Sequence, residues 1–176
     1  TVMITWPKIV AFAVETAMRR SEITGLLRTN VNRGKRVALL PMTKNGSARG
    51  VPLSSKAVEI LESLAERDDG RCFKSRPDSI TKAFSDAIVD ARSTYTDGLS
   101  LHLKQKKLSQ GKIDQHISDD PFLMDLRFHD LRHEATSRLA EIFPLHELTK
   151  ITGHQDTRML MRYYHPRTED LAKKLQ

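Results

Sequence analysis

The chain has 176 residues, which is enough for one domain with a sizeable core. Its 29 Lys and Arg residues outnumber its 22 Asp and Glu residues, and the formal charge of +7 favours a polyanionic partner. A single cysteine, Cys72, excludes an internal disulfide framework and fits a reducing compartment. No apolar run approaches the ~18 residues of a membrane span, and the N-terminus lacks a signal-peptide pattern, so we expect a cytoplasmic protein without a membrane partner.

The first third of the chain predicts two helices and a hairpin. Residues 5–20 carry Pro in the first turn and apolar residues at helical spacing, and a second short helix is expected around residues 21–27. In residues 35–54, two β-rich stretches flank an Asn-Gly dipeptide, which is a strong hairpin signal. Lys44 is expected at the tip of this hairpin.

Two further helices are expected over residues 54–70 and 78–92, the first with a Ser cap and a closing Gly. From residue 93 to residue 120 the periodicity stops and the composition turns polar. We predict a long loop or insertion here, and it could be either a solvated segment or a flap that contacts phosphate.

From residue 128 the chain is predicted to be helical almost to its end, with breaks at Pro144, Gly153 and Pro166. Residues 166–176 are expected to form a short amphipathic tail helix. Helices, one hairpin and further helices, in that order, predict a mainly α fold with a small antiparallel β-sheet, an α+β class.

The segment "HDLRH" carries the first candidates for chemistry. His129, Arg132 and His133 share one helix face, and His at i and i+4 is the spacing of a helical zinc site. A metalloprotease, however, needs Glu directly after the first His, and Asp130 is shorter. An adjacent His-Asp pair could also serve a metal-dependent phosphohydrolase built on His129, Asp130 and His133. In either case the cation at Arg132 would repel a metal ion.

A second interpretation places a phosphate between two arginines. Arg19 and Arg132 could clamp one, because guanidinium groups match phosphate oxygens and stay charged. Arg19 with Glu22 at i, i+3 would otherwise be an ordinary surface pair, and Lys44 a solvated lysine. This interpretation still requires a nucleophile. Two adjacent tyrosines near the C-terminus, Tyr163 and Tyr164, are the candidates.

Four segments together resemble the boxes of the tyrosine recombinases, the phage-integrase type. "ETAMRRSEITGLL" is similar to the first box and implies Arg19 as a catalytic arginine with Glu22 as its acidic partner. "TKNGSARGVPL" is similar to the hairpin box, in which the catalytic lysine stands seven residues before the Val of Val-Pro-Leu, as Lys44 does.

The two C-terminal boxes supply the rest of the site. "FHDLRHEATSRL" resembles the second box and implies His129 and Arg132 as catalytic residues, with His133 as a companion of unsettled role. "ITGHQDTRMLMRYYH" resembles Leu-Gly-His followed nine residues later by the tyrosine, which implies His154 and Tyr163. On a helix Tyr164 would then point about 100° away, toward packing or solvent.

The likeness runs from about residue 4 to residue 174, and the boxes occur in the expected order and spacing. Ala17 stands where the family usually has Gly, a change that suits a helix. The segment 93–120 is longer than the family usually needs. Residues 1–176 therefore look like the catalytic domain for DNA breaking and rejoining. The chain starts without Met and turns helical at once, so we expect the N-terminal DNA-binding domain to be absent from it.

The resemblance implies a site-specific recombinase in which Tyr163 attacks a DNA phosphodiester and forms a 3′-phosphotyrosyl link. Arg19 and Arg132 would neutralise the phosphate, and neither a cofactor nor a metal would be required. Lys44 would be the general acid, His129 would assist as base and His154 would hydrogen-bond the phosphate.

The expected partner is double-stranded DNA, bound by a homotetramer, with the isolated domain monomeric and encoded by a bacterium or phage. Three alternatives stay open. These are relaxation of DNA of the type IB topoisomerase kind, a DNA-binding regulator with a decayed site, and the metal-dependent phosphohydrolase.

Overall fold

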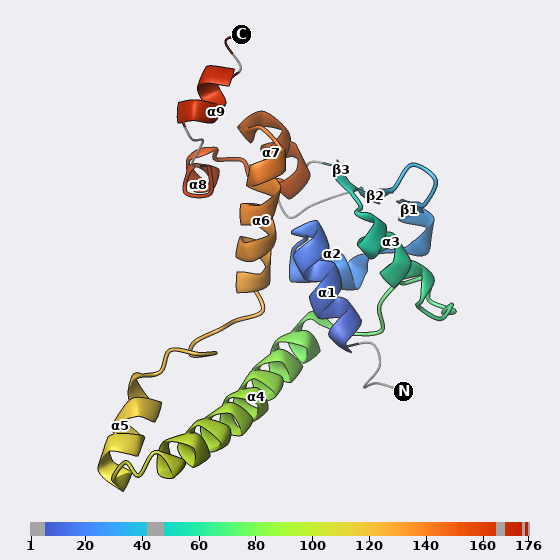
Figure 1. The fold of residues 1–176 in the computed structure, drawn as a ribbon. Coiled ribbons are helices and arrows are strands. Elements are labelled where there is room, and N and C mark those ends of the chain that lie inside the picture. The colour runs from blue at the N-terminus through green and yellow to red at the C-terminus, as the bar shows by residue number, and fades with distance from the viewer. Residues whose placement is uncertain (1–5, 42–47, 165–167, 174, 176) are drawn as a thin grey trace. The chain divides into compact units, whose positions relative to one another are not determined.

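The computed structural model describes residues 6–41, 48–164, 168–173 and 175 (Figure 1). The chain divides into two compact units. Unit 1 comprises Thr1–Pro77 and His129–Gln176, and unit 2 comprises Asp78–Phe128. Every described residue of the predicted site belongs to unit 1, so that unit positions the chemistry.

Unit 1 is mostly helical and carries one small sheet, which confirms the predicted fold class. Its first part contains α1 (Trp6–Thr16), α2 (Arg20–Gly25), the short 3₁₀ turn η1 (Arg28–Asn30), β1 (Val31–Asn32), β2 (Val37–Leu40), β3 (Arg49–Pro52) and α3 (Ser55–Glu62). Its second part contains α6 (Asp130–Ile142), α7 (Leu145–Thr152), α8 (Arg158–Met161) and α9 (Thr168–Lys173).

The three strands form an antiparallel sheet in the order β1-β2-β3. Ala38 of β2 pairs with Val51 of β3, and both side chains are fully buried, whereas Leu39 points outward with 54% exposure. The β2–β3 pair confirms the hairpin predicted from Asn-Gly. Its tip, with Lys44, lies outside the described residues, and β1 was not predicted.

The core of unit 1 forms where α1 packs against α3 and α6, and α7 packs against β3. Phe12 of α1 is fully buried, and its ring lies 5.2 Å from that of Phe73. A second apolar cluster of Ala140, Leu148 and Leu160 joins α6, α7 and α8. The helices that carry the candidate residues are therefore fixed to one another by buried contacts.

Ala17 ends the first helix earlier than predicted. Helix α1 stops at Thr16, and Ala17 adopts a left-handed φ of 51°. Arg19 is consequently not on the first helix but is the N-cap residue of α2, with Glu22 in the first turn. Gly suits a left-handed position because it has no Cβ atom, and Ala17 occupies such a position. Our interpretation of Ala17 as a helical residue was therefore wrong.

Unit 2 corrects the prediction of a loop over residues 93–120. Helix α4 runs without a break from Pro77 to Gln105, and α5 spans Gln110–Asp119. The Arg92 guanidinium fastens the end of α5, since it donates to the Asp120 carboxylate at 2.9 Å and to the carbonyls of Ile117, Asp120 and Phe122 at 2.7–2.8 Å. A polar helix without a clear apolar stripe can be held by such contacts, and periodicity does not reveal them.

The remaining helices largely follow the predicted breaks. The Ser54 hydroxyl caps α3, but this helix ends at Glu62, well before Gly70. Helix α6 ends before Pro144, and α7 ends before Gly153. Helix α8 is a single short turn ending at Met161, so both tyrosines lie beyond it and the assumed helical offset between them does not apply. None of the described helices combines the length and apolarity needed to cross a membrane.

Candidate active site

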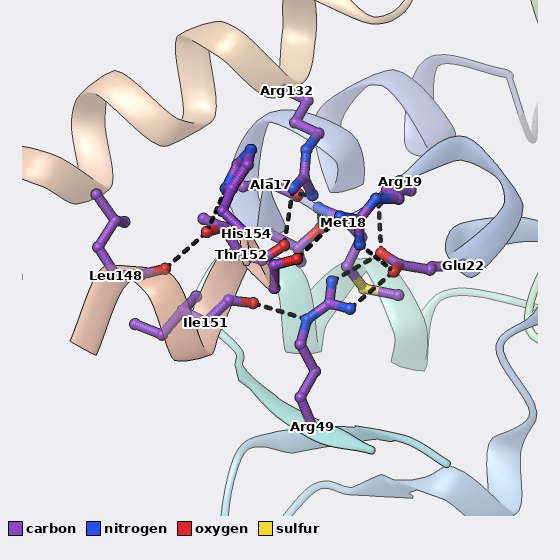
Figure 2. Close-up of polar contacts among 12 residues, drawn as sticks. Ala17, Met18, Arg19, Glu22, Arg49, Arg132, Leu148, Ile151, Thr152 and His154 are labelled. Carbon is purple, nitrogen blue, oxygen red and sulfur yellow. Dashed lines mark hydrogen bonds and ion pairs between the residues drawn. The ribbon is translucent and has the colours of Figure 1, made fainter. Parts of the chain in front are cut away.

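The C-terminal end of α7 anchors three arginines from three different parts of unit 1 (Figure 2). Three consecutive carbonyls each accept a hydrogen bond from a different guanidinium: Ile151 from Arg49 at 3.0 Å, Thr152 from Arg132 at 2.7 Å and Gly153 from Arg19 at 3.0 Å. The last carbonyls of a helix have no partner inside the helix and carry partial negative charge. This helix end therefore gathers positive side chains.

Gly153 meets two requirements at this helix end. Its φ of 68° is left-handed, which is the usual conformation after a helix C-terminus. A Cβ atom built on Gly153 would lie 2.9 Å from Nη1 of Arg49. A larger residue here would strain the backbone and displace Arg49.

Glu22 is the carboxylate shared by two of the arginines (Figure 2). Its Oε1 and Oε2 accept hydrogen bonds from Arg49 at 2.7 and 2.8 Å, and Oε1 also pairs with Nη1 of Arg19 at 2.9 Å. Burial alone would raise the pKa of Glu22, but hydrogen bonds from Arg49 and from the Arg19 backbone outweigh it and hold the pKa below its ordinary value. The carboxylate is therefore ionised and fixed.

Arg132 is the most buried cation of the cluster, with 5% exposure. Besides Thr152 it contacts the carbonyl of Ala17, the left-handed residue after α1. Burial and the neighbouring Arg19 lower its pKa to about 10, so it remains charged at neutral pH. The cluster thus contains three guanidinium groups and one carboxylate, which pairs with Arg19 and Arg49 only, and the excess positive charge suits a phosphate. The Arg19 side chain keeps 28% exposure, so a ligand can reach it.

Tyr163 and His133 contact each other through the tyrosine hydroxyl and Nδ1 of the histidine ring. The Tyr163 ring packs on the apolar cluster of α6, α7 and α8, and the Arg162 guanidinium lies 5.4 Å from its centroid. This packing fixes the hydroxyl beside α6. Tyr164 follows in the chain and is half-buried.

Two other histidines surround the cluster. His129 precedes α6 as its N-cap residue, and its ring meets that of His133 edge to face at 4.9 Å. Burial, followed by the charges of His133 and Arg132, lowers the pKa of His129. Nδ1 of His154 lies 2.7 Å from the hydroxyl of Thr152. Burial and then the Arg132 and Arg19 charges lower the pKa of His154 to about 4.

The fold brings most of the sequence-predicted residues into one cluster, and Lys44 lies outside the described residues. The described members are Arg19, Glu22, His129, Arg132, His133, His154 and Tyr163.

Arg49 was missed. It follows the hairpin tip in a short strand, where a charged residue normally faces solvent, and no sequence signal marked it as buried. Within the described part of the chain, no three His, Cys or acidic side chains converge as a metal cluster would require.

Comparison with known proteins identifies the family. Residues 4–170 match the phage integrase family. The chain belongs to this family. A Haemophilus influenzae protein of the integrase/recombinase group is 38% identical over 169 residues, covering 94% of this chain and 46% of that protein. A shufflon-specific DNA recombinase of Escherichia coli is 34% identical over 169 residues, covering 95% of this chain and 36% of that protein. The chain spans less than half the length of these curated relatives.

Solved structures of two integrases share the fold. The Tn1549 transposon integrase, in complex with transposon right end DNA, aligns with a TM-score of 0.60 and 17% identity over 96% of this chain and 57% of that one. The catalytic domain of bacteriophage HP1 integrase aligns with a TM-score of 0.59 and 23% identity over 96% of this chain and 80% of that one. These likenesses confirm the tyrosine recombinase fold of the catalytic domain.

Proposed function

We propose that the chain is the catalytic domain of a site-specific DNA recombinase that cleaves and rejoins DNA through a 3′-phosphotyrosyl intermediate. The observation that carries this proposal is the position of Tyr163. Its hydroxyl contacts a histidine on α6, the same helix that supplies Arg132 to the arginine cluster. A nucleophile with a nearby base, next to excess positive charge, suits phosphoryl transfer.

In the cleavage step the Tyr163 oxygen attacks the phosphorus and the bond to the 5′ oxygen breaks. His133 would take the tyrosine proton in place of His129, because its Nδ1 contacts the hydroxyl, and His129, whose ring meets that of His133, would support it. The electron pair leaves with the 5′ oxygen, and by family resemblance Lys44 supplies the proton that makes it a hydroxyl. The phosphotyrosyl bond conserves the energy of the phosphodiester, so a 5′-hydroxyl from a second duplex can reverse the step and exchange strands.

Arg19 and Arg132 would bind the two non-bridging oxygens and stabilise the charge of the transition state. Their anchoring to α7, together with the Glu22 and Arg49 pair, holds them in place before substrate arrives. Such preorganisation avoids rearranging the charged groups during the reaction.

The working assembly belongs to the same proposal. Exchange between two duplexes needs four active sites, so we infer a homotetramer on double-stranded DNA and a monomer for the isolated domain. The relatives are longer proteins of bacteria and phages, which supports an additional N-terminal DNA-binding domain in the whole protein and action in a bacterial cytoplasm.

The test is a pair of tyrosine variants on a nicked suicide duplex, which traps the covalent adduct. Tyr163→Phe should keep DNA binding near wild type and abolish the adduct, because only the attacking oxygen is lost. Tyr164→Phe is the matched control and should form adduct at the wild-type level. Peptide mapping of the adduct to Tyr164, adduct in Tyr163→Phe, or loss of wild-type cleavage in EDTA would overturn the assignment.

A further inference from the structure

Thr152 has a buried hydroxyl that connects two groups of the site (Figure 2). It is the last residue of α7 and is fully buried. Its Oγ1 lies 2.7 Å from the Leu148 carbonyl and 2.7 Å from Nδ1 of His154. The family pattern given above has Leu at this position, which could make neither contact, so the contacts distinguish this chain from that pattern.

These two contacts determine where the imidazole proton lies. A carbonyl oxygen can only accept, so the Thr152 hydroxyl donates its one proton to Leu148. The same oxygen must then accept a hydrogen bond from His154, and therefore Nδ1 of His154 carries a proton. When His154 is neutral, its Nε2 presents a lone pair and no proton.

The groups around His154 oppose a second proton. Arg132 of α6, Arg19 before α2, Arg49 of β3 and Arg162 after α8 all act on it with positive charge. Lys150 of α7 lines the same cleft of about 490 Å³ as His154, while the nearby carboxylate of Glu22 is already engaged by Arg19 and Arg49. In the free protein, burial and this cationic surround keep His154 neutral at neutral pH.

We propose that Thr152 is a positioning residue that fixes His154 in its Nδ1–H tautomer. His154 can then donate to a phosphate only if its Nε2 takes up a proton when the phosphate binds. A neutral ring would point its Nε2 lone pair at an anionic oxygen, which is repulsive. The phosphate charge offsets the surrounding arginines, and solvent supplies the proton. This inference rests on the proposed function, because it assigns the phosphate to the arginine cluster.

The first experiment reads the tautomer directly and needs no DNA. ¹⁵N NMR of the chain labelled at histidine should show a protonated Nδ1 and an unprotonated Nε2 for His154 at neutral pH. Thr152→Val should populate the Nε2–H tautomer, and Thr152→Ser should restore the wild-type spectrum. Thr136→Val is the matched control, since the buried Thr136 hydroxyl donates to the Arg132 carbonyl one helical turn earlier, as Thr152 does to Leu148.

The second experiment adds sulfate, a tetrahedral anion that does not itself titrate near neutral pH. Sulfate should raise the pKa of His154 in the wild type by about one unit or more, because an anion within hydrogen-bonding distance favours the charged ring. In Thr152→Val, sulfate should raise the pKa of His154 less, since the neutral His154 ring of this variant can already donate from Nε2. An unprotonated Nδ1 in the wild type, or a sulfate response of Thr152→Val equal to that of the wild type, would overturn the inference.

The third experiment separates this inference from the proposed function. On a nicked duplex that the wild type cleaves, the rate should fall as pH rises through the phosphate-bound pKa of His154, and the fall should weaken in Thr152→Val but not in Thr136→Val. A wild type that cleaves no DNA would reject the proposed function and leave the NMR result standing. Cleavage with identical pH profiles in all three proteins would reject the inference alone.

Discussion

Arg49 illustrates how a buried side chain can hold a site together without meeting the substrate. Its guanidinium uses Nη1 and Nη2 on the Glu22 carboxylate and Nε on the Ile151 carbonyl, thereby joining β3, α2 and α7. Its side chain is 7% exposed and that of Glu22 is 9% exposed. Arg49 therefore governs the orientation of Glu22, and through it Arg19.

We predict that Arg49→Met destabilises the protein by about 3 kcal/mol, because it leaves Glu22 buried with only Arg19 as a partner. Arg138→Met is the matched control, since Arg138 pairs with Glu134 on the surface of α6 with exposures of 61% and 54%. This control should cost less than about 0.5 kcal/mol. Urea unfolding measures both, and equal costs would contradict a structural role for Arg49.

The lowered pKa values of two histidines predict how stability depends on pH. His154 titrates near pH 4 when folded and at its ordinary 6.5 when unfolded, so between these values the unfolded chain binds the proton better. His129 is shifted in the same direction. The contribution of His154 to stability is complete above about pH 6.5 and is lost as pH falls toward 4, and that of His129 is also lost as pH falls.

Replacement of His154 tests this dependence. His154→Gln should flatten the decline of the urea midpoint between pH 6.5 and about 4, because it removes one of the groups that must take up a proton. His146→Gln controls for the loss of a surface histidine, since the His146 side chain is 75% exposed. An unchanged slope in His154→Gln would contradict the lowered pKa.

At the scale of elements, the connection between α1 and α2 decides where Arg19 lies. The left-handed Ala17 turns the chain sharply, which places Arg19 at the N-cap of α2 and presents the Ala17 carbonyl to Arg132. The same short turn therefore positions both arginines of the proposed phosphate site.

We predict that Ala17→Gly leaves stability within about 0.5 kcal/mol of wild type. Relief of the left-handed conformation, about 1–2 kcal/mol, offsets the lost methyl burial and the greater freedom of the unfolded chain. Ala13→Gly is the control, because Ala13 is equally buried but lies within α1, and it should cost about 1.5–2 kcal/mol. Thermal unfolding compares the two, and equal losses would contradict the strain at Ala17.

At the scale of the molecule, the charge of +7 bears on DNA binding. We predict weak binding of a duplex by this chain, with an affinity that falls steeply as salt rises, because each neutralised phosphate releases counterions. Fluorescence anisotropy over a salt series measures the slope. A methylphosphonate duplex of the same sequence lacks the backbone charge and should show little slope. Nanomolar binding that ignores salt would contradict the prediction.

The sequence by itself predicted the features that depend on local backbone chemistry. The Asn-Gly dipeptide predicted the hairpin, and Pro144 and Gly153 predicted the helix ends, because backbone restrictions act within a few residues. The spacing of the boxes likewise selected Arg19, Arg132 and Tyr163, and the fold places them in one unit. Spacing alone could not assign a contact to any of them.

The tertiary structure decided whatever depends on contacts between distant segments. The long α4 and α5 are fastened by Arg92 across more than twenty residues, and Arg49 becomes a buried partner of Glu22 only when β3 meets α2. Ala17 is left-handed although its own propensity favours a helix. In each case a tertiary contact or turn outweighs the local preference.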